Sequence, residues 1–400
     1  MISGKMEALG VKKSVIREIF EYAKARKTEI GEENVFDYSI GNPSVSAPAV
    51  VTETLMRLLT KTEATTLHGY TSAQGDAGVR AAIAEYIRKT YDAPADASLI
   101  YLTAGAAAAL TITLNAVLAD GEEEEVIVFA PFFPEYKVFT EKAGGHLVPV
   151  PCSEPDFQID FAAFEAAITE KTKAVIVNSP NNPTGVVLSE DSIRRLCEIL
   201  LEAEKRYEHE IFLISDEPYR ELVYGGVKVP YLTSYYDNTI VCYSFSKSLS
   251  LPGERIGYLL VSPKAQNAAG VYAAVLGAGR ALGFVCAPSL FQYMIPDCLG
   301  KTSDLSVYEE NRKVLFEALT CYGYSVANPD GAFYLFVKAL EPDAYRFCEA
   351  AKKYELLLVP SDDFGFPGYV RIAYCVTTEQ IRRSLPAFRS LAAEYQSKRG

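Results

Sequence analysis

Histidine is scarce in this chain, with three residues among 400. So few imidazole groups argue against a histidine-rich metal site, and we expect no metal ion. The eight cysteines include no Cys-x-x-Cys pair, and a chain of this length does not need disulfide bonds to hold its core together. We therefore expect reduced thiols and a cytoplasmic protein.

Long apolar runs and positive charge are also in short supply. No run reaches the roughly 18 apolar residues that a membrane-spanning helix requires, and the first residues, MISGKMEALGVKKS, show no signal-peptide pattern. Acidic residues number 51 and basic residues 39, which gives a formal net charge of −12. This charge disfavours nucleic acids and anionic membranes as partners, but a local basic pocket for a small anion remains compatible with it.

From about residue 95 to 262 the chain alternates short β-branched apolar runs with helical periods. Continuous apolar strands separated by helices predict a mostly parallel sheet with helices on both faces, which places the chain in the α/β class. Helices are expected at Gly105–Ala119, Phe161–Thr169 and Ser189–Tyr207. The expected strands are Leu99–Thr103, Val126–Phe129, Leu147–Val150, Ala174–Val177, Ile211–Ser215, Thr239–Tyr243 and Ile256–Val261.

The two ends of the chain predict a second, smaller α+β domain. After about residue 290 come two helical periods, short strands near Phe333–Val337, Leu356–Val359 and Tyr369–Ala373, and a last helix. An amphipathic helical pattern in the first thirty residues has no partner in the sheet, so we expect it to pack on the C-terminal part. The predicted division is a large domain of residues 48–292 and a small domain of residues 1–47 with 293–400.

Ligands of parallel α/β sheets bind at the carboxyl ends of the strands, so the residues that follow each strand are candidates. Gly105, Ala106 and Ala107 open a helix, where exposed N–H groups and the helix dipole favour an anion such as phosphate. Phe133, in Ala-Pro-Phe-Phe-Pro, is an aromatic ring that can stack on a flat ligand. A closely packed helix and a core phenylalanine are the ordinary alternatives.

Three polar residues follow the central strands. Asn182 lies in Asn-Ser-Pro-Asn-Asn-Pro-Thr-Gly, where two prolines and a glycine fix a turn that holds amides at the sheet edge. Asp216 ends a buried strand, where a carboxylate requires a cation or a donor; a pyridinium N–H would satisfy it, and a helix N-cap is the ordinary alternative. Tyr219, three residues on, can face the same site.

Lys247, in Ser-Phe-Ser-Lys, is a candidate amine nucleophile because it lies next to strands and away from any run of charges. Ser244 and Arg255 lie on either side of it and can hold a phosphate group. Taken alone, the lysine would be interpreted as a surface residue.

Together, these strings resemble the class I/II (fold type I) aminotransferases, which depend on pyridoxal 5'-phosphate (PLP). The resemblance runs from Ile-Gly-Asn-Pro at residues 40–43 to Tyr-Val-Arg-Ile at residues 369–372. Asn-Pro-Thr-Gly and Ser-x-Ser-Lys are its specific elements, and Asn182, Asp216, Lys247 and Arg255 follow in the family's order and spacing. It implies fold type I, with a large domain around a mostly parallel sheet and a smaller α+β domain.

The resemblance also implies roles. Lys247 would hold PLP as a Schiff base and move the substrate's proton, Asp216 would keep the pyridine nitrogen protonated, and Tyr219 would bind the phenolate oxygen together with Asn182. Phe133 would stack on the ring. The phosphate would be held by Gly105, Ala106, Ala107, Ser244 and Arg255.

For the substrate, the resemblance implies that Arg371 pairs with the α-carboxylate, next to Asn182 and helped by the Gly41 backbone. Tyr70, in Gly-Tyr-Thr, resembles the tyrosine that reaches the phosphate in the neighbouring subunit, which implies a homodimer with shared active sites. The expected reaction moves an amino group between an L-amino acid (aspartate, alanine or aromatic) and a 2-oxo acid by a ping-pong mechanism.

Substrate and reaction type stay open in several respects. Ala106–Ala108 stands where one aspartate-specific subgroup has a lysine, while Arg280 is a candidate for an arginine that another subgroup supplies from the partner subunit. Leu251–Gly257 also resembles aminocyclopropane-carboxylate synthases, and the scaffold supports C–S lyases. A regulatory PLP-binding domain is disfavoured, because about forty residues before Gly41 are too few for a winged-helix segment.

Overall fold

The computed structural model describes residues 2–11, 14–119, 121 and 123–397. At its centre lies a seven-stranded sheet with the strand order β2-β8-β7-β6-β5-β3-β4. Four neighbouring pairs are parallel, and β8 runs antiparallel to both of its neighbours, so the predicted mostly parallel α/β sheet is confirmed. The strands are β2 (Ile100–Thr103), β3 (Glu125–Ala130), β4 (His146–Pro151), β5 (Thr172–Asn178), β6 (Phe212–Asp216), β7 (Thr239–Ser244) and β8 (Gly257–Val261).

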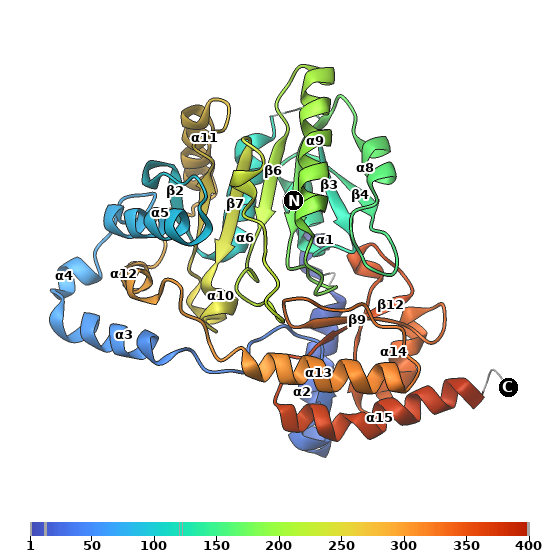
Figure 1. The fold of residues 1–400 in the computed structure, drawn as a ribbon. Helices are drawn as coiled ribbons and strands as arrows, with labels where there is room; N and C mark the ends of the chain where they lie inside the picture. Colours follow the sequence, from blue (N-terminus) through green and yellow to red (C-terminus); the bar gives the residue numbers. More distant parts are fainter. Residues whose placement is uncertain (1, 12–13, 120, 122, 398–400) are drawn as a thin grey trace.

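Helices cover both faces of this sheet (Figure 1). Along β5, Ala174 and Ile176 pack towards α6 (Gly105–Val117) and α11 (Ala268–Ala281), whereas Val175 and Val177 pack towards the opposite face. Successive strand residues point to opposite faces, so a strand covered on both sides is apolar throughout. The opposite face is covered by α5 (Ala77–Tyr91), α8 (Phe161–Ala167), α9 (Glu190–Tyr207) and α12 (Ser289–Cys298).

The residues at the two ends of helix α9 explain where this helix begins and ends. The Ser189 side chain accepts a hydrogen bond from the Ser192 N–H, so Ser189 is the N-cap and the helix begins one residue later than predicted. Glu190 lies in its first turn and Arg206 in its last, which suits the helix dipole. Further helices near this sheet are α3 (Ala49–Lys61), α4 (Ala64–Leu67), α7 (Glu135–Lys142) and α10 (Phe245–Ser248).

A three-stranded antiparallel sheet, in the order β11-β12-β9, lies beside the carboxyl end of the large sheet (Figure 1). Its core is apolar and packs under the C-terminal helices. The predicted strand at Leu356–Val359 is in fact two strands in different sheets, because β10 pairs with the N-terminal strand β1. The elements are β1 (Phe36–Asp37), β9 (Tyr334–Lys338), β10 (Leu356–Leu357), β11 (Val359–Pro360), β12 (Tyr369–Ala373), α13 (Ser306–Cys321), α14 (Ala344–Lys352) and α15 (Thr378–Ser397).

The N-terminal region contains two helices, α1 (Gly4–Val11) and α2 (Val15–Ile30), where one amphipathic helix was expected. Ser14 caps α2, which explains its start. Helix α2 buries Ile19 and Ala23 against the β10–β11 segment, so it packs on the C-terminal part as predicted. The domain boundaries proposed from the sequence stay a prediction.

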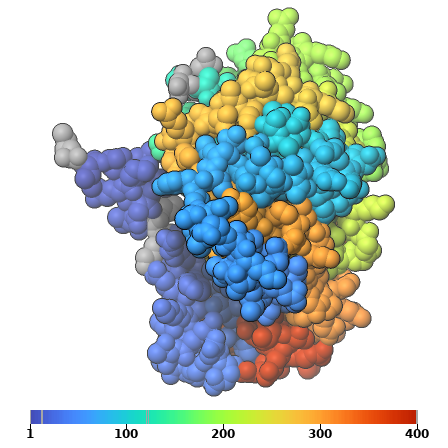
Figure 2. Space-filling view, turned by 90° about the vertical axis from the view of Figure 1, so that its left-hand side faces the viewer, coloured from blue at the N-terminus to red at the C-terminus, as the bar shows by residue number. Residues whose placement is uncertain are grey.

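Apolar side chains remain exposed on part of the surface. Helix α1 buries none of its residues and projects from the main body in Figure 2, while its Lys5 Nζ donates to the Glu141 carbonyl oxygen of α7 at 3.3 Å. On the same face, α3 and α4 lie beside α12, and Met56 and Leu59 of α3 are largely exposed. Within the described ranges, no helix combines the length and apolar character needed to cross a membrane.

Candidate active site

A cavity of about 290 Å³ lies where the carboxyl ends of the large sheet's strands meet the smaller sheet. This volume is near the lower end of the ~300–1,000 Å³ typical of small-molecule sites. Gly105 lies beside it, against Arg255, and Tyr70 does not line it. The other predicted site residues all line it: Gly41, Ala106, Ala107, Phe133, Asn182, Asp216, Tyr219, Ser244, Lys247, Arg255 and Arg371.

Asp216 is buried at the end of β6 and carries one unsatisfied oxygen. Its Oδ2 accepts hydrogen bonds from the Tyr136 hydroxyl at 2.5 Å and, more weakly, from Asn178 Nδ2 at 3.4 Å. Its Oδ1 is buried and has no partner among the described residues. A buried carboxylate oxygen without a donor is costly, so this atom is suited to a ligand N–H. The pyridine nitrogen of PLP, when protonated, is such a group, and the residues present fit it.

Burial raises the pKa of Asp216 to about 7, while the hydrogen bond from Tyr136 lowers it and the nearby Glu217 raises it. A positive ligand group at Oδ1 would favour the carboxylate form. Burial and the neighbouring Asp216 raise the pKa of Tyr136 well above its ordinary value, so this hydroxyl stays protonated and donates. We therefore expect the Asp216 carboxyl group to be ionised when a cation lies next to it.

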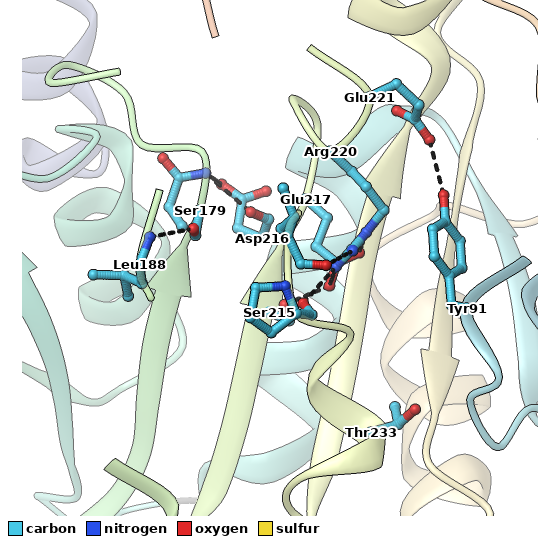
Figure 3. Close-up of polar contacts among 12 residues, drawn as sticks. Tyr91, Ser179, Leu188, Ser215, Asp216, Glu217, Arg220, Glu221 and Thr233 are labelled. Atoms are coloured by element: carbon cyan, nitrogen blue, oxygen red, sulfur yellow. Dashed lines mark hydrogen bonds and ion pairs between the residues drawn. The ribbon is translucent and has the colours of Figure 1, made fainter. Parts of the chain in front are cut away.

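The next residue, Glu217, forms a separate buried ion pair behind the site. Its carboxylate binds the Arg220 guanidinium through both oxygens and accepts a hydrogen bond from Ser215 at 2.7 Å. Arg220 lies over the rings of Tyr231 and Tyr91. Figure 3 shows Glu217 reaching Arg220, whereas Asp216 lies on the other side of the strand end, as the alternation of a β-strand requires. The pair fixes the segment that carries Asp216.

Lys247 lies in the short helix α10, and its Nζ donates to the Gly41 carbonyl oxygen at 2.6 Å. The pKa of Lys247 is lowered to about 8, mainly by burial; Cys375 opposes this shift, and the positive charges of Arg371 and Arg255 contribute to it. A neutral amine is the nucleophilic and basic form of lysine. Lys247 is therefore available as a nucleophile near neutral pH.

This pKa gives a test that needs no ligand. A free lysine titrates near ~10.4, and the neutral fraction of Lys247 increases as the pH rises through about 8. We expect its labelling by trinitrobenzenesulfonate, followed by peptide mass spectrometry, to increase with a midpoint near pH 8. A midpoint like that of free lysine would contradict the burial argument.

The start of helix α6 forms an anion-binding end of the cavity. Gly105 has a φ of +80°, and any side chain there would come within 2.8 Å of the Arg255 guanidinium. The N-cap Ala104 makes no side-chain hydrogen bond, so the first-turn N–H groups have no side-chain acceptor. Ser246, which the sequence interpretation did not assign, bonds Ser244 Oγ at 2.8 Å and faces Arg255. Together these donors suit a phosphate group.

Arg371, on β12, is the positive group at the opposite wall. It is 2% exposed and donates to Asn182 Oδ1 at 3.2 Å and to the Ser39 carbonyl oxygen at 2.5 Å. Its Nε is buried without a partner, and among the described residues no carboxylate pairs with it. A buried guanidinium without an anion is costly, so the site favours a carboxylate ligand.

Two hydroxyls and an aromatic ring complete the lining. Tyr219 Oη lies 2.8 Å from Tyr334 Oη, and the Tyr334 ring stacks on the Arg371 guanidinium at 4.8 Å. Phe133 meets the ring of Tyr136 edge-on at 5.7 Å, so both are held beside Asp216. Tyr136 follows Phe133 by three residues, and this short spacing was the one sequence signal that could have revealed it. No sequence signal indicated Tyr334, because its position in an apolar run is typical of an ordinary core strand residue.

Comparisons with known proteins identify the family of this chain. The family described as "Aminotransferase class I and II" matches residues 33–388. An amino transferase of Eubacterium rectale has a crystal structure with a TM-score of 0.97 and 54% identity, covering 99% of both chains. Aspartate aminotransferase of Thermotoga maritima is 30% identical over 96% of this chain and 97% of its own. The structure of aspartate aminotransferase of Thermus thermophilus with maleate has a TM-score of 0.85 and 27% identity, covering 98% of this chain and all of its own. The chain belongs to the class I and II aminotransferase family, with its fold type I architecture.

Proposed function

We propose that this aminotransferase binds PLP in the cavity and moves an amino group between an L-amino acid and a 2-oxo acid by a ping-pong mechanism. One observation carries the proposal: the Lys247 amine, the unpaired Oδ1 of Asp216 and the unpaired Arg371 guanidinium all face one cavity. These are an amine nucleophile, an acceptor for a ring N–H and a clamp for a carboxylate.

PLP, when bound, supplies an aldehyde carbon that takes up nitrogen and a ring that withdraws electrons. Asp216 Oδ1 would accept the ring N–H, and Phe133 would cover the ring. Tyr219 and Asn182 would bind the ring oxygen. The Asn182 side-chain oxygen already accepts a hydrogen bond from Arg371, so the Asn182 NH₂ group is the part that would donate to the ring oxygen. Gly105, Ala106, Ala107, Ser244, Ser246 and Arg255 would hold the phosphate.

Lys247 has two tasks in this proposal. Its Nζ would hold the cofactor through its aldehyde carbon, and as a free amine it would take the proton from the substrate Cα. Its pKa, lowered to about 8, suits an amine that must accept and return a proton near neutral pH. Because the same Arg371 would bind the carboxylate of the amino acid and then that of the oxo acid, the two substrates occupy the site in turn.

Arg371 gives a prediction on binding. Arg371→Ala removes the carboxylate clamp, and we expect kcat/KM to fall by the equivalent of about 2–5 kcal/mol for amino and oxo acids alike. Arg371→Lys keeps a charge without the two-pronged geometry and should recover part of the loss. Steady-state kinetics measures both variants, and an Arg371→Ala enzyme with unchanged kcat/KM would remove Arg371 from the substrate role.

Transamination can be separated from the lyase alternatives by following nitrogen. We expect ¹⁵N from a labelled amino acid to appear in the amino acid formed from an added 2-oxo acid, with little release of ammonia. Relatives are named for aspartate, prephenate and aromatic substrates, and the proposed substrates include aspartate, alanine or aromatic amino acids. Ammonia and an oxo acid appearing without an added acceptor would indicate a C–S lyase or an aminocyclopropane-carboxylate-synthase-like reaction.

We also propose a cytoplasmic homodimer. Tyr70 is fully exposed and lies outside its own cavity. The exposed Phe284 and Val285 precede Cys286, which contacts Thr71 next to Tyr70, and α3 exposes Met56 and Leu59. Such clustered apolar side chains favour a protein interface. In a dimer that brings Tyr70 to the partner's phosphate, we expect Tyr70→Phe to weaken PLP binding about tenfold, the loss of one hydrogen bond to a charged group. PLP titration by fluorescence measures this, and an active monomer in sedimentation would contradict the assignment.

A further inference from the structure

Three cations line the cavity among the described residues, and the proposed function uses all of them. Arg255 belongs to the anion-binding end with Gly105 and Ser244, Lys247 is the amine nucleophile, and Arg371 takes the α-carboxylate. Arg280 is exposed on α11 and does not line the cavity. A second carboxylate on the substrate would therefore meet no further positive charge in this chain's own lining.

The cavity lining also contains apolar side chains to which the proposed function assigns no role. Ile40 directly precedes Gly41 and directly follows Ser39, whose carbonyl oxygen binds Arg371, so it lies at the carboxylate-binding end. Ile16, from the first turn of α2, lines the cavity as well. The Tyr334 ring stacks on Arg371, and any side chain at Gly41 would overlap its hydroxyl. Ile40 and the Tyr334 ring therefore lie at the carboxylate-binding end, and Ile16 adds a second isoleucine to the lining of the same cavity.

We propose that the preferred amino donors carry an uncharged apolar side chain, of the leucine or phenylalanine class, rather than a second carboxylate. This inference rests on the proposed function and names its substrate class. An apolar side chain gains from burial against Ile16 and Ile40, whereas a carboxylate would lose its water without gaining a cation. The chain would then differ in substrate from the relatives named for aspartate.

Binding of carboxylic acids that lack an amino group tests the proposal without turnover. 4-Methylpentanoate and succinate would be titrated into the holoenzyme by isothermal calorimetry. We expect 4-methylpentanoate to bind at least about tenfold more tightly, a difference of ~1.4 kcal/mol. Equal or tighter binding of succinate would overturn the proposal. If Arg280→Ala then abolished succinate binding, Arg280 of a partner copy would be the missing cation.

Variants test whether the preference for apolar amino donors arises from the apolar lining. Ile16→Ala is expected to lower the ratio of kcat/KM for leucine to that for alanine by about three- to tenfold, because alanine is too short to use the same contact. Leu9→Ala, which shortens an exposed apolar residue of α1 outside the cavity, serves as the matched control and should leave the ratio unchanged. An unchanged ratio in Ile16→Ala would overturn the role of Ile16 and with it the proposed apolar subsite.

The same kinetics distinguish a failure of the apolar substrate preference from a failure of the proposed aminotransferase function. If aspartate or glutamate converts the bound cofactor faster than leucine, phenylalanine and methionine do, the aminotransferase proposal stands and the apolar inference fails. If no amino acid converts the bound cofactor at all, both fail.

Discussion

Lys247→Ala is expected to lower kcat/KM for transamination by about 10⁴-fold or more, because it removes the covalent attachment point and the proton carrier together. No other amine lines the cavity in the described part of the chain, since the two remaining cations are the guanidinium groups of Arg255 and Arg371. Steady-state kinetics with a coupled assay of the oxo-acid product measures the loss. Borohydride reduction followed by peptide mapping should in addition find PLP on Lys247 in the parent protein only.

The matched control is Lys264→Ala, which removes an exposed lysine outside the cavity. This variant should keep the parent activity and the parent melting temperature. The Lys247→Ala protein should also fold, because it replaces a buried amine with a smaller apolar group. A folded Lys247→Ala protein with activity within tenfold of the parent would exclude the proposed mechanism.

Asp216→Asn is expected to lower kcat by about 10²–10³-fold, the scale seen when one preorganised electrostatic contact is removed from an active site. The amide keeps the volume of the side chain and an acceptor for Tyr136, but it carries no charge to favour a protonated ring nitrogen. The loss should be mainly in kcat, because Arg371 and the phosphate-binding residues still hold their ligands. Comparing kcat with KM tests this division.

Asp191→Asn is the control for Asp216→Asn, since Asp191 lies exposed in the first turn of α9. It should cost a few tenths of a kcal/mol of stability through the helix dipole and leave kcat unchanged. Asp216→Asn with a parent kcat would remove the carboxylate from the ring nitrogen. A fall in both variants would indicate a general effect of stability on the assay.

The central strands of the large sheet could be predicted because they are buried on both faces and consist of continuous apolar runs, whereas the edge strand β4 is partly exposed. The short strands at Leu356–Pro360 were harder to predict, since a strand of two residues is too short to show the alternation of a β-strand. The split N-terminal helix was missed because the capping role of Ser14 outweighs a helical pattern that continues through it. Capping by Ser189 likewise makes α9 begin one residue later than predicted.

Most of the predicted site residues lie in short strings at the strand ends of the large sheet, and a parallel sheet brings such ends to one edge. This explains why Asn182, Asp216 and Lys247 meet although they are far apart in sequence. The partners of these residues could not be predicted in the same way. Tyr136, on α7, reaches Asp216 and Ile16, on α2, reaches the cavity through tertiary packing, which the strand-end pattern does not record.

The most direct test of PLP-dependent transamination is an absorbance measurement on the purified protein with PLP bound. Amino acids would be added one at a time while the band of the lysine-linked cofactor and the band of the aminated cofactor are followed. We expect one class of amino acid to convert the first band into the second, and an added 2-oxo acid to convert it back. Bands that stay unchanged while ammonia and an oxo acid accumulate, or a protein that binds no PLP, would contradict the account.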